Sequence, residues 1–459
     1  MLNTDGDLPR HLVTGKYILE TGQLPQTEPF VYPYQNQEFV SQQWLSGVVF
    51  YLIYKYTGLS GIVVFSALLL AGAFLLLYND LAKRLDLRFS IFLVVMLGAA
   101  TTSLSWITRP HLISMFFLAV WLVWADRLRR GENMSIWYFP VLMLIWTNFH
   151  GEFISGMLVL LAYAAGSFID NLMHKDGKSE IKKIWFALIL SGLITIINPG
   201  GLKRWAGMLG FMNNQYMMTR MLEANPPNFQ DPEMNVLLGL IALSIFLLAY
   251  NKNRMSASQG LLLAGFTAMS LMAFRNIHLY GVVAPFVLSE TLSSTIEIPF
   301  IKRFEQNLKV IETNIQKGFV LPLAVVIALS VFISTSKAGS KIYNFNSEFF
   351  PVNAVNWVKE HPPKGNMFND LNWGGYIALN LWPDQLTFVD SVADIDGQLT
   401  MQYEKVVTLQ SGWENIFEEY DIQWAIIPSQ SKLSDELVKQ GWNTQYVDKT
   451  TIVLQAQTK

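Results

Sequence analysis

Cysteine is absent from this chain of 459 residues, and charged side chains are scarce. Without cysteine, no part of the protein can rely on a disulfide bond. Only 15% of the residues are charged, whereas 51% are hydrophobic, which leaves too few polar side chains to cover a soluble core of this size. The composition therefore predicts an α-helical protein that crosses the lipid bilayer several times.

Uncharged apolar runs predict about ten membrane spans. Several runs are shorter than the roughly 20 residues that a straight span needs, so they require polar flanks or shielding by neighbouring helices. The runs cover residues 60–78, 90–107, 110–125, 136–147, 153–168, 184–197, 236–250, 259–273, 279–288 and 319–334.

Lysine and arginine gather in every second loop between these runs. Because cytosolic loops are enriched in these residues, the remaining loops are predicted to be extracytoplasmic, in a multi-pass protein of the inner or plasma membrane. The extracytoplasmic set includes the first 45 residues and everything after about residue 337. The basic loops hold residues 83–88, 127–130, 175–183, 252–254 and 302–317.

Two further absences narrow the function. The spans carry almost no ionisable residues away from their ends, which argues against an ion-coupled transporter. No glycine-rich phosphate loop precedes a predicted helix, so a cytosolic nucleotide-sugar site is not expected. The candidate chemistry therefore lies in the extracytoplasmic loops.

Three domains are predicted. Residues 1–58 form an extracytoplasmic loop with an interfacial helix at 39–57, whose apolar sequence is broken by glutamines and rimmed by tyrosines. No apolar run precedes this loop, so we expect an upstream transmembrane helix to be missing from the sequence. Residues 59–336 form the multi-span domain. Residues 337–459 form a small soluble α/β domain with helices at 351–359, 412–420 and 434–440, and strands at 376–381, 386–389, 424–427 and 450–454.

The N-terminal loop offers the first candidate site. Asp5, Asp7 and His11 lie within seven residues, and Glu28 follows in a Thr-Glu-Pro-Phe segment. Carboxylates and an imidazole this close can supply a general base or ligands for a divalent cation. A solvated polar tail has the same spacing, and that alternative stays open.

Three other loops carry clusters of arginine, histidine or acid. Arg109 precedes a proline at a membrane boundary, where a guanidinium can bind phosphate or simply reach toward the interface. A second loop contains His150 and Glu152, and a third contains Arg275, Asn276 and His278. Clusters that converge on one face predict a cavity for an anionic lipid headgroup such as a phosphate or pyrophosphate.

The C-terminal domain contains a dense pattern of aromatic and glycine residues. Trp373 precedes two glycines, and Asp390 follows a short apolar stretch. The aromatic ring can stack on a sugar while the carboxylate accepts hydrogen bonds from its hydroxyls. A glycine turn into a strand with core aromatics gives the same pattern.

In this set of motifs the chain resembles bacterial polytopic members of the GT-C class of glycosyltransferases, mostly uncharacterised and mannosyltransferase- or oligosaccharyltransferase-like. The C-terminal pattern also resembles the Trp- and Gly-rich signature of oligosaccharyltransferase catalytic subunits. The likeness covers nearly the full length. It is carried by Asp5-Gly-Asp7 with His11 and Gly15, Pro25 with Glu28-Pro-Phe30, Trp44-Leu45, the segments 109–114, 148–151, 198–201 and 274–276, and Trp373-Gly-Gly-Tyr376 with Val389-Asp390.

The resemblance implies transfer of a sugar from a polyprenyl-phosphate carrier to an extracytoplasmic glycan, lipid or protein acceptor. An acid in the first external loop is the expected catalytic base, which here is Asp7 or Asp5. The implied substrate-binding residues are His11, Glu28, Arg109, His150, Glu152, Arg275, Asn276, His278, Trp373 and Asp390. A divalent cation at Asp5 and Asp7 is possible, no other cofactor is implied, and no nucleic-acid partner is expected.

A second function stays open beside this one. A non-catalytic membrane protein that binds lipid-linked glycans during assembly of envelope polysaccharide needs the arginine clusters but not the two aspartates. Loss of activity on substitution of Asp7 or Asp5 distinguishes the two.

Overall fold

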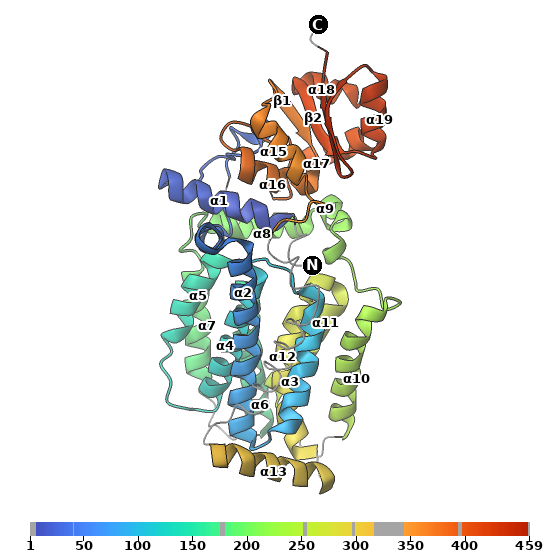
Figure 1. The fold of residues 1–459 in the computed structure, drawn as a ribbon. Helices are drawn as coiled ribbons and strands as arrows, with labels where there is room; N and C mark the ends of the chain where they lie inside the picture. The colour runs from blue at the N-terminus through green and yellow to red at the C-terminus, as the bar shows by residue number, and fades with distance from the viewer. Residues whose placement is uncertain are drawn as a thin grey trace.

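The computed structural model describes residues 6–39, 41–174, 180–250, 255–295, 299–315, 344–392 and 397–457. A bundle of apolar helices stands below a small α/β domain, and two helices, α1 (Asp7–Thr21) and α8 (Leu202–Asn213), lie crosswise between them (Figure 1). The apolar helices and the small sheet agree with the predicted fold class.

The bundle is formed by the apolar runs of the sequence. Within the described part of the chain, four helices are both long and apolar enough to cross a membrane, namely Trp44–Leu85, His111–Arg129, Phe153–Met173 and Pro232–Tyr250, with shorter apolar helices at Phe89–Ser105, Tyr138–Phe149 and Ala257–Met272. The run at 319–334 lies outside the described residues, so the count of about ten spans stays a prediction. The bundle elements are α2 (Trp44–Leu85), α3 (Phe89–Thr102), α4 (His111–Arg129), α5 (Tyr138–Phe149), α6 (Phe153–His174), α7 (Ile181–Ile194), α10 (Asn235–Tyr250), α11 (Ala257–Met272) and α12 (Ile277–Thr295).

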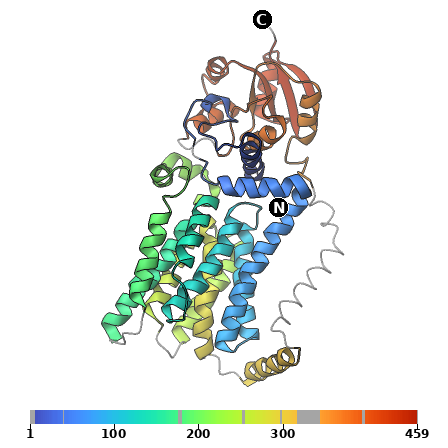
Figure 2. The ribbon, with the colours of Figure 1, turned by 90° about the vertical axis from the view of Figure 1, so that its left-hand side faces the viewer.

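Helix α2 bends sharply at Gly58. This residue has φ 65° and ψ −164°, a backbone conformation that side chains with a Cβ disfavour. The first half of α2 therefore lies across the end of the bundle, and the second half runs down into it (Figure 2). Its crosswise half occupies most of the segment for which the sequence predicts an interfacial helix.

Helix α1 crosses α2 at a pair of glycines. A Cβ built on Gly15 would lie 2.0 Å from the carbonyl oxygen of Gly47, so only glycine permits this approach. The sequence predicts a loop here, whereas the structure shows a helix that also packs against α16 of the C-terminal domain.

At the opposite end of the bundle, arginines converge on a buried carboxylate. Arg84, Arg129 and Arg130 lie 3.1, 2.8 and 2.9 Å from the Asp126 carboxylate oxygens. Nearby, Glu305 of α13 (Pro299–Ile315) accepts hydrogen bonds from the backbone N–H groups of Phe89 and Ser90 at the start of α3. Paired charges of this kind are compatible with helix ends at a membrane boundary.

The C-terminal domain is a four-stranded mixed sheet with helices. The strand order is β1-β2-β4-β3; β1 runs parallel to β2, and the other pairs are antiparallel. The elements are α15 (Val352–Glu360), β1 (Asn366–Asn369), α16 (Gly374–Leu381), α17 (Gln398–Val407), α18 (Glu414–Glu419), β2 (Ile422–Pro428), α19 (Lys432–Lys439), β3 (Asn443–Val447) and β4 (Thr451–Gln455).

Two predicted strands in this domain are wrong. Residues 376–381 belong to helix α16, and residues 386–389 contribute only an isolated bridge between Thr387 and Val31. The paired glycines begin a helix rather than a turn, and two other segments approach them so closely that a side chain would not fit. A Cβ on Gly374 would lie 2.1 Å from the Val389 oxygen, and one on Gly375 would lie 2.8 Å from the Arg10 nitrogen.

Candidate functional site

The first part of the site is an arginine shared by two carboxylates. Asp7 is the first residue of α1, and Arg109 lies just before α4. Arg109 Nη1 is 3.1 Å from Asp7 Oδ2 and 3.3 Å from Oε2 of Glu223, which belongs to the short helix η3 (Leu222–Ala224). All three side chains are partly exposed, so an anion that enters can reach the guanidinium.

His11 lies one helical turn after Asp7, and its imidazole lies near basic side chains. Burial lowers its pKa, and the neighbouring His150, Arg109 and Arg10 lower it further, to about 3. A neutral imidazole results at physiological pH. The interactions with His150 and Arg109 also show that α1, the start of α4 and the turn after α5 meet at one place.

The turn between α5 and α6 holds His150 through a chain of hydrogen bonds. Trp146 donates its indole N–H to Ser114 Oγ over 2.8 Å. Ser114 Oγ in turn lies 3.0 Å from His150 Nδ1, and the tautomer of His150 sets which of the two atoms donates. This chain fixes the ring of His150 from behind.

Glu152 joins two histidines in the same region. Its Oε1 is 3.0 Å from His278 Nε2, and its Oε2 is 3.5 Å from His150 Nδ1. Burial opposes ionisation of this carboxyl, but His278 and His150 outweigh that effect and hold its pKa well below the usual range. The ring of His111 lies 5.2 Å from that of His278 and donates from Nε2 to the Ser105 carbonyl over 2.7 Å.

These contacts bring together five predicted residues: Asp7, His11, Arg109, His150 and Glu152, with His278 behind them. The set combines a carboxylate on an accessible arginine with a carboxylate between imidazoles. Such an arrangement can bind an anion and accept a proton beside it.

A divalent cation finds little support among the described residues. They contain no group of three or more histidine, cysteine or acidic side chains placed to hold a metal ion. Asp7 already faces the Arg109 guanidinium, and Asp5 lies outside the described residues.

Glu28 and Asp390 do not join this site. Both carboxylates contact the buried Arg10, with Nη2 to Glu28 Oε2 at 2.7 Å and Nε to Asp390 Oδ2 at 2.7 Å. The Arg10 guanidinium also lies 4.4 Å from the ring centre of Phe30. Burial raises the pKa of Glu28, and the negative charge of Asp390, which contacts the same cation, raises it further. The positive charge of Arg10 opposes this shift. These residues connect α1 to the C-terminal domain.

The remaining predicted residues lie in structural positions. Trp373 is buried in the core of the C-terminal domain and donates its indole N–H to the Phe349 carbonyl over 2.7 Å. Its ring is therefore closed to a sugar. Asn276 Nδ2 donates to the Met269 carbonyl over 3.1 Å from the short helix η5 (Phe274–Asn276). Arg275 of the same helix is half-buried, and η5 packs against η3, which carries Glu223.

Sequence reasoning missed several members of the site. His111 is part of the Arg-Pro-His motif and would have been found by grouping all six histidines of the chain. The sequence did not indicate Glu223 as a site residue, because a single acid in a long loop has no distinctive spacing.

The fold is similar to that of crystal structures of the Archaeoglobus fulgidus oligosaccharyltransferase. The apo form matches with a TM-score of 0.60 and 11% identity over 93% of this chain and 66% of that chain. The form tethered via a disulfide bond with an acceptor peptide containing the NVT sequon matches with a TM-score of 0.59 and 11% identity over 99% and 70%. The chain thus spans just under two thirds of the first structure's length. No protein-family model and no curated protein sequence matches. At this identity the likeness shows a shared fold.

Proposed function

We propose that this membrane protein transfers a sugar from a polyprenyl-phosphate donor to an extracytoplasmic glycan, lipid or protein acceptor. The observation that carries the proposal is the contact of Arg109 with Asp7 and Glu223, beside Glu152 and its histidines. This arrangement supplies a candidate base and a phosphate-binding cation at the end of the apolar bundle. The oligosaccharyltransferase-like fold supports the same reaction class.

In the proposed reaction, the donor phosphate enters first and takes the Arg109 guanidinium from the two carboxylates. Exposed or half-exposed ion pairs contribute only about 0–1 kcal/mol, so this exchange costs little. Asp7 then turns toward the acceptor.

The transfer itself is an inverting displacement. The acceptor nucleophile attacks the anomeric carbon and gives its proton to Asp7, which acts as the general base. The bond between the anomeric carbon and the phosphate oxygen breaks, and polyprenyl phosphate leaves with the bonding electrons. Arg109 stabilises the charge that develops on the leaving phosphate. Glu152, His150 and His278 are proposed to hold the donor sugar through its hydroxyl groups.

The test is a membrane assay with a panel of radiolabelled polyprenyl-phosphate sugars. Asp7→Asn keeps the size of the side chain but removes the base, and we expect carrier-dependent transfer to fall by at least about 10²-fold. Asp5→Asn is measured in parallel, because Asp5 is the other predicted base. Asp231→Asn is the matched control, an exposed aspartate on the loop that carries Glu223, and should leave transfer unchanged.

The competing function is non-catalytic binding of lipid-linked glycans. If the wild-type protein binds these carriers but transfers no sugar, or if Asp7→Asn and Asp5→Asn both turn over as the wild type does, the transferase proposal is wrong in its reaction or its base. A peptide acceptor and a glycan acceptor are tested separately in the same assay.

A further inference from the structure

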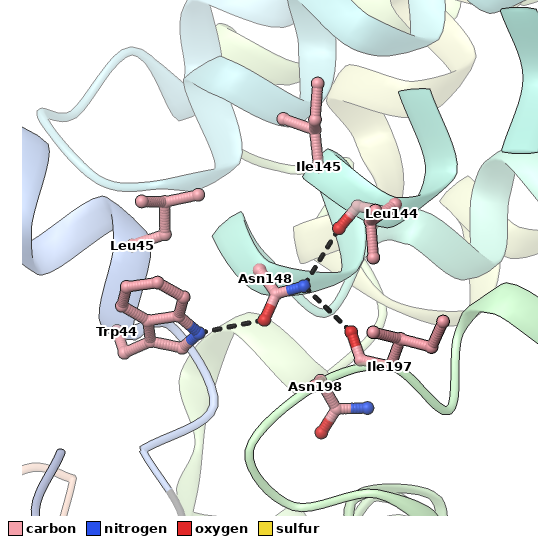
Figure 3. A pocket seen from close by; sticks show the side chains of 7 residues that line it. All are labelled: Trp44, Leu45, Leu144, Ile145, Asn148, Ile197 and Asn198. Carbon is pink, nitrogen blue, oxygen red and sulfur yellow. Dashed lines mark hydrogen bonds between the residues drawn. The ribbon is translucent and has the colours of Figure 1, made fainter. Parts of the chain in front are cut away.

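An apolar groove lies where α2 begins and where α5 and α7 end. It has a volume of about 470 Å³ and is lined by Trp44, Leu45, Leu144, Ile145, Asn148, Ile197 and Asn198 (Figure 3). The volume falls within the roughly 300–1,000 Å³ of ligand sites. The groove lies beside Asn148, two residues before His150, but shares no lining residue with the candidate catalytic site.

Both asparagines of the groove are engaged by the protein: Asn198 Nδ2 donates to the Thr195 carbonyl over 2.7 Å, and its Oδ1 accepts from the Gly200 N–H over 2.9 Å. Asn148 Oδ1 accepts the indole N–H of Trp44 over 2.9 Å, and its Nδ2 donates to the carbonyls of Leu144 and Ile197 over 2.9 and 3.1 Å (Figure 3). These bonds join three chain segments around the groove. The groove is therefore preformed and presents an apolar surface to its occupant.

The groove opens toward the apolar side of the bundle. Ile145 is 40% exposed and Ile197 is 57% exposed. Ile145 continues a row of exposed side chains on α5 with Tyr138 and Val141, and Ile197 follows a similar row on α7 with Ile189 and Leu193. Exposed apolar rows on spanning helices face lipid chains, so an acyl chain can enter sideways.

A polar pocket begins where the groove ends. The two cavities share Asn198, and the pocket has a volume of about 340 Å³. It is lined by residues 24–26, Glu38, Phe39, Ser41, residues 198–201 and Lys203. At its rim, Lys203 Nζ lies 2.5 Å from Glu38 Oε1, and both side chains are about two-thirds exposed. The pocket thus offers one positive and one negative group side by side.

We propose that groove and pocket together bind one phospholipid whose headgroup carries both a phosphate and a primary ammonium. Its acyl chain lies in the groove, its phosphate pairs with Lys203, and its ammonium pairs with Glu38. The charge pattern selects a zwitterionic headgroup, because a purely anionic one satisfies Lys203 but meets the Glu38 carboxylate with like charge. The Glu38 carboxylate favours a primary over a quaternary ammonium, because only the primary one donates N–H hydrogen bonds to it. Opening the exposed Lys203–Glu38 pair costs only about 0–1 kcal/mol.

The lipid would hold together elements that also build the catalytic site. The pocket is lined by the loop that follows α1, and the groove by the first residues of α2. Helix α1 carries Asp7 and His11. The inference does not depend on the transfer reaction, because it rests on a different cavity.

The experiment measures which lipid remains bound to the purified full chain. The protein is reconstituted in nanodiscs of phosphatidylcholine with equal fractions of phosphatidylethanolamine and phosphatidylglycerol of identical acyl chains. It is then extracted in mild detergent, and the retained lipids are measured by native mass spectrometry. We expect retention of phosphatidylethanolamine over phosphatidylglycerol by several-fold.

Two variants test the groove and the polar pocket separately, and a third is a control. Ile145→Trp fills the groove with another apolar side chain and should abolish retention of both lipids. Glu38→Gln removes the negative group and should shift the preference to phosphatidylglycerol. Glu180→Gln is the matched control for Glu38→Gln, because Glu180 is also an acid paired with a lysine, Lys183, at the far end of α7, and should change nothing.

A preference of the wild type for phosphatidylglycerol, equal retention of both lipids, or no retention would overturn the proposal. So would retention that Ile145→Trp leaves unchanged. Glu38→Gln replaces a surface side chain and keeps the inference testable even if Ile145→Trp alters the fold.

Discussion

Arg109 contacts both Asp7 and Glu223, and two different substitutions of this arginine should change the transfer activity to different extents. Arg109→Lys keeps the positive charge but loses the planar fork, so it should retain part of the transfer activity. Arg109→Gln removes the charge that stabilises the leaving phosphate and should lower kcat by about 10²–10³-fold.

The radiolabel assay measures both variants, and Arg303→Gln serves as a control for loss of an exposed arginine at the opposite end of the bundle. Equal activity of Arg109→Gln and the wild type would remove Arg109 from the proposed mechanism.

A second residue, His11, links the site to pH. Its folded-state pKa of about 3 lies below the unfolded value of 6.5. As pH falls from 6.5 toward 3, His11 binds a proton in the unfolded chain but stays neutral in the folded protein. The folded state therefore loses stability, at up to about 1.4 kcal/mol per pH unit.

His11→Gln removes this titration, so the variant should lose less stability than the wild type on acidification. The apparent Tm is followed by tryptophan fluorescence in detergent between pH 7 and pH 4. Parallel pH profiles of the two proteins would show that His11 ionises normally in the folded state.

At the scale of elements, the crossing of α1 over α2 depends on contact between two backbones. Gly15→Ala places a Cβ 2.0 Å from the Gly47 oxygen and 2.8 Å from Tyr51 Cβ, so the helices must separate. We expect a loss of about 1–3 kcal/mol, seen as a lower apparent Tm, and reduced transfer because Asp7 and His11 move with α1.

Gly210→Ala is the matched control. Gly210 lies in helix α8, and a Cβ there meets nothing within 4 Å, so alanine should be neutral or stabilising by up to about 1 kcal/mol. If both alanine variants behave alike, the close crossing is not needed for folding.

At the scale of the whole molecule, Arg10 joins the two ends of the chain. It lies near the N-terminus and binds Glu28 in the next loop and Asp390 in the C-terminal domain. Arg10→Met leaves two buried carboxylates without a cation, which should cost about 3–5 kcal/mol. Glu28→Gln should cost less, because burial already raises the pKa of Glu28 and Arg10 keeps Asp390.

Tryptophan fluorescence and limited proteolysis of the C-terminal domain measure this difference. If neither Arg10→Met nor Glu28→Gln lowers stability, the domain is held by its apolar contacts alone.

The composition of the sequence and the spacing of its residues were sufficient to predict the features that depend on local chemistry. Uncharged apolar runs become helices of the bundle, because each run must satisfy its own backbone hydrogen bonds in an apolar environment. The predicted helices around α15, α18 and α19 and the strands within β2 and β4 are found because the spacing of their apolar residues indicates which type of element buries them. The convergence of Arg109, His150, Glu152 and His278 also follows from loops that end at the same side of the bundle.

Only the tertiary structure decided which acid meets which arginine. Glu28 and Asp390 have the residue types of a sugar site, yet packing of α1 on α16 turns them toward Arg10. The glycines at 374 and 375 begin a helix instead of a strand turn, at the place where α1 and the Val389 segment leave no room for a Cβ. Contacts between segments so distant in the chain depend on how whole elements pack, and no local pattern of residues records that.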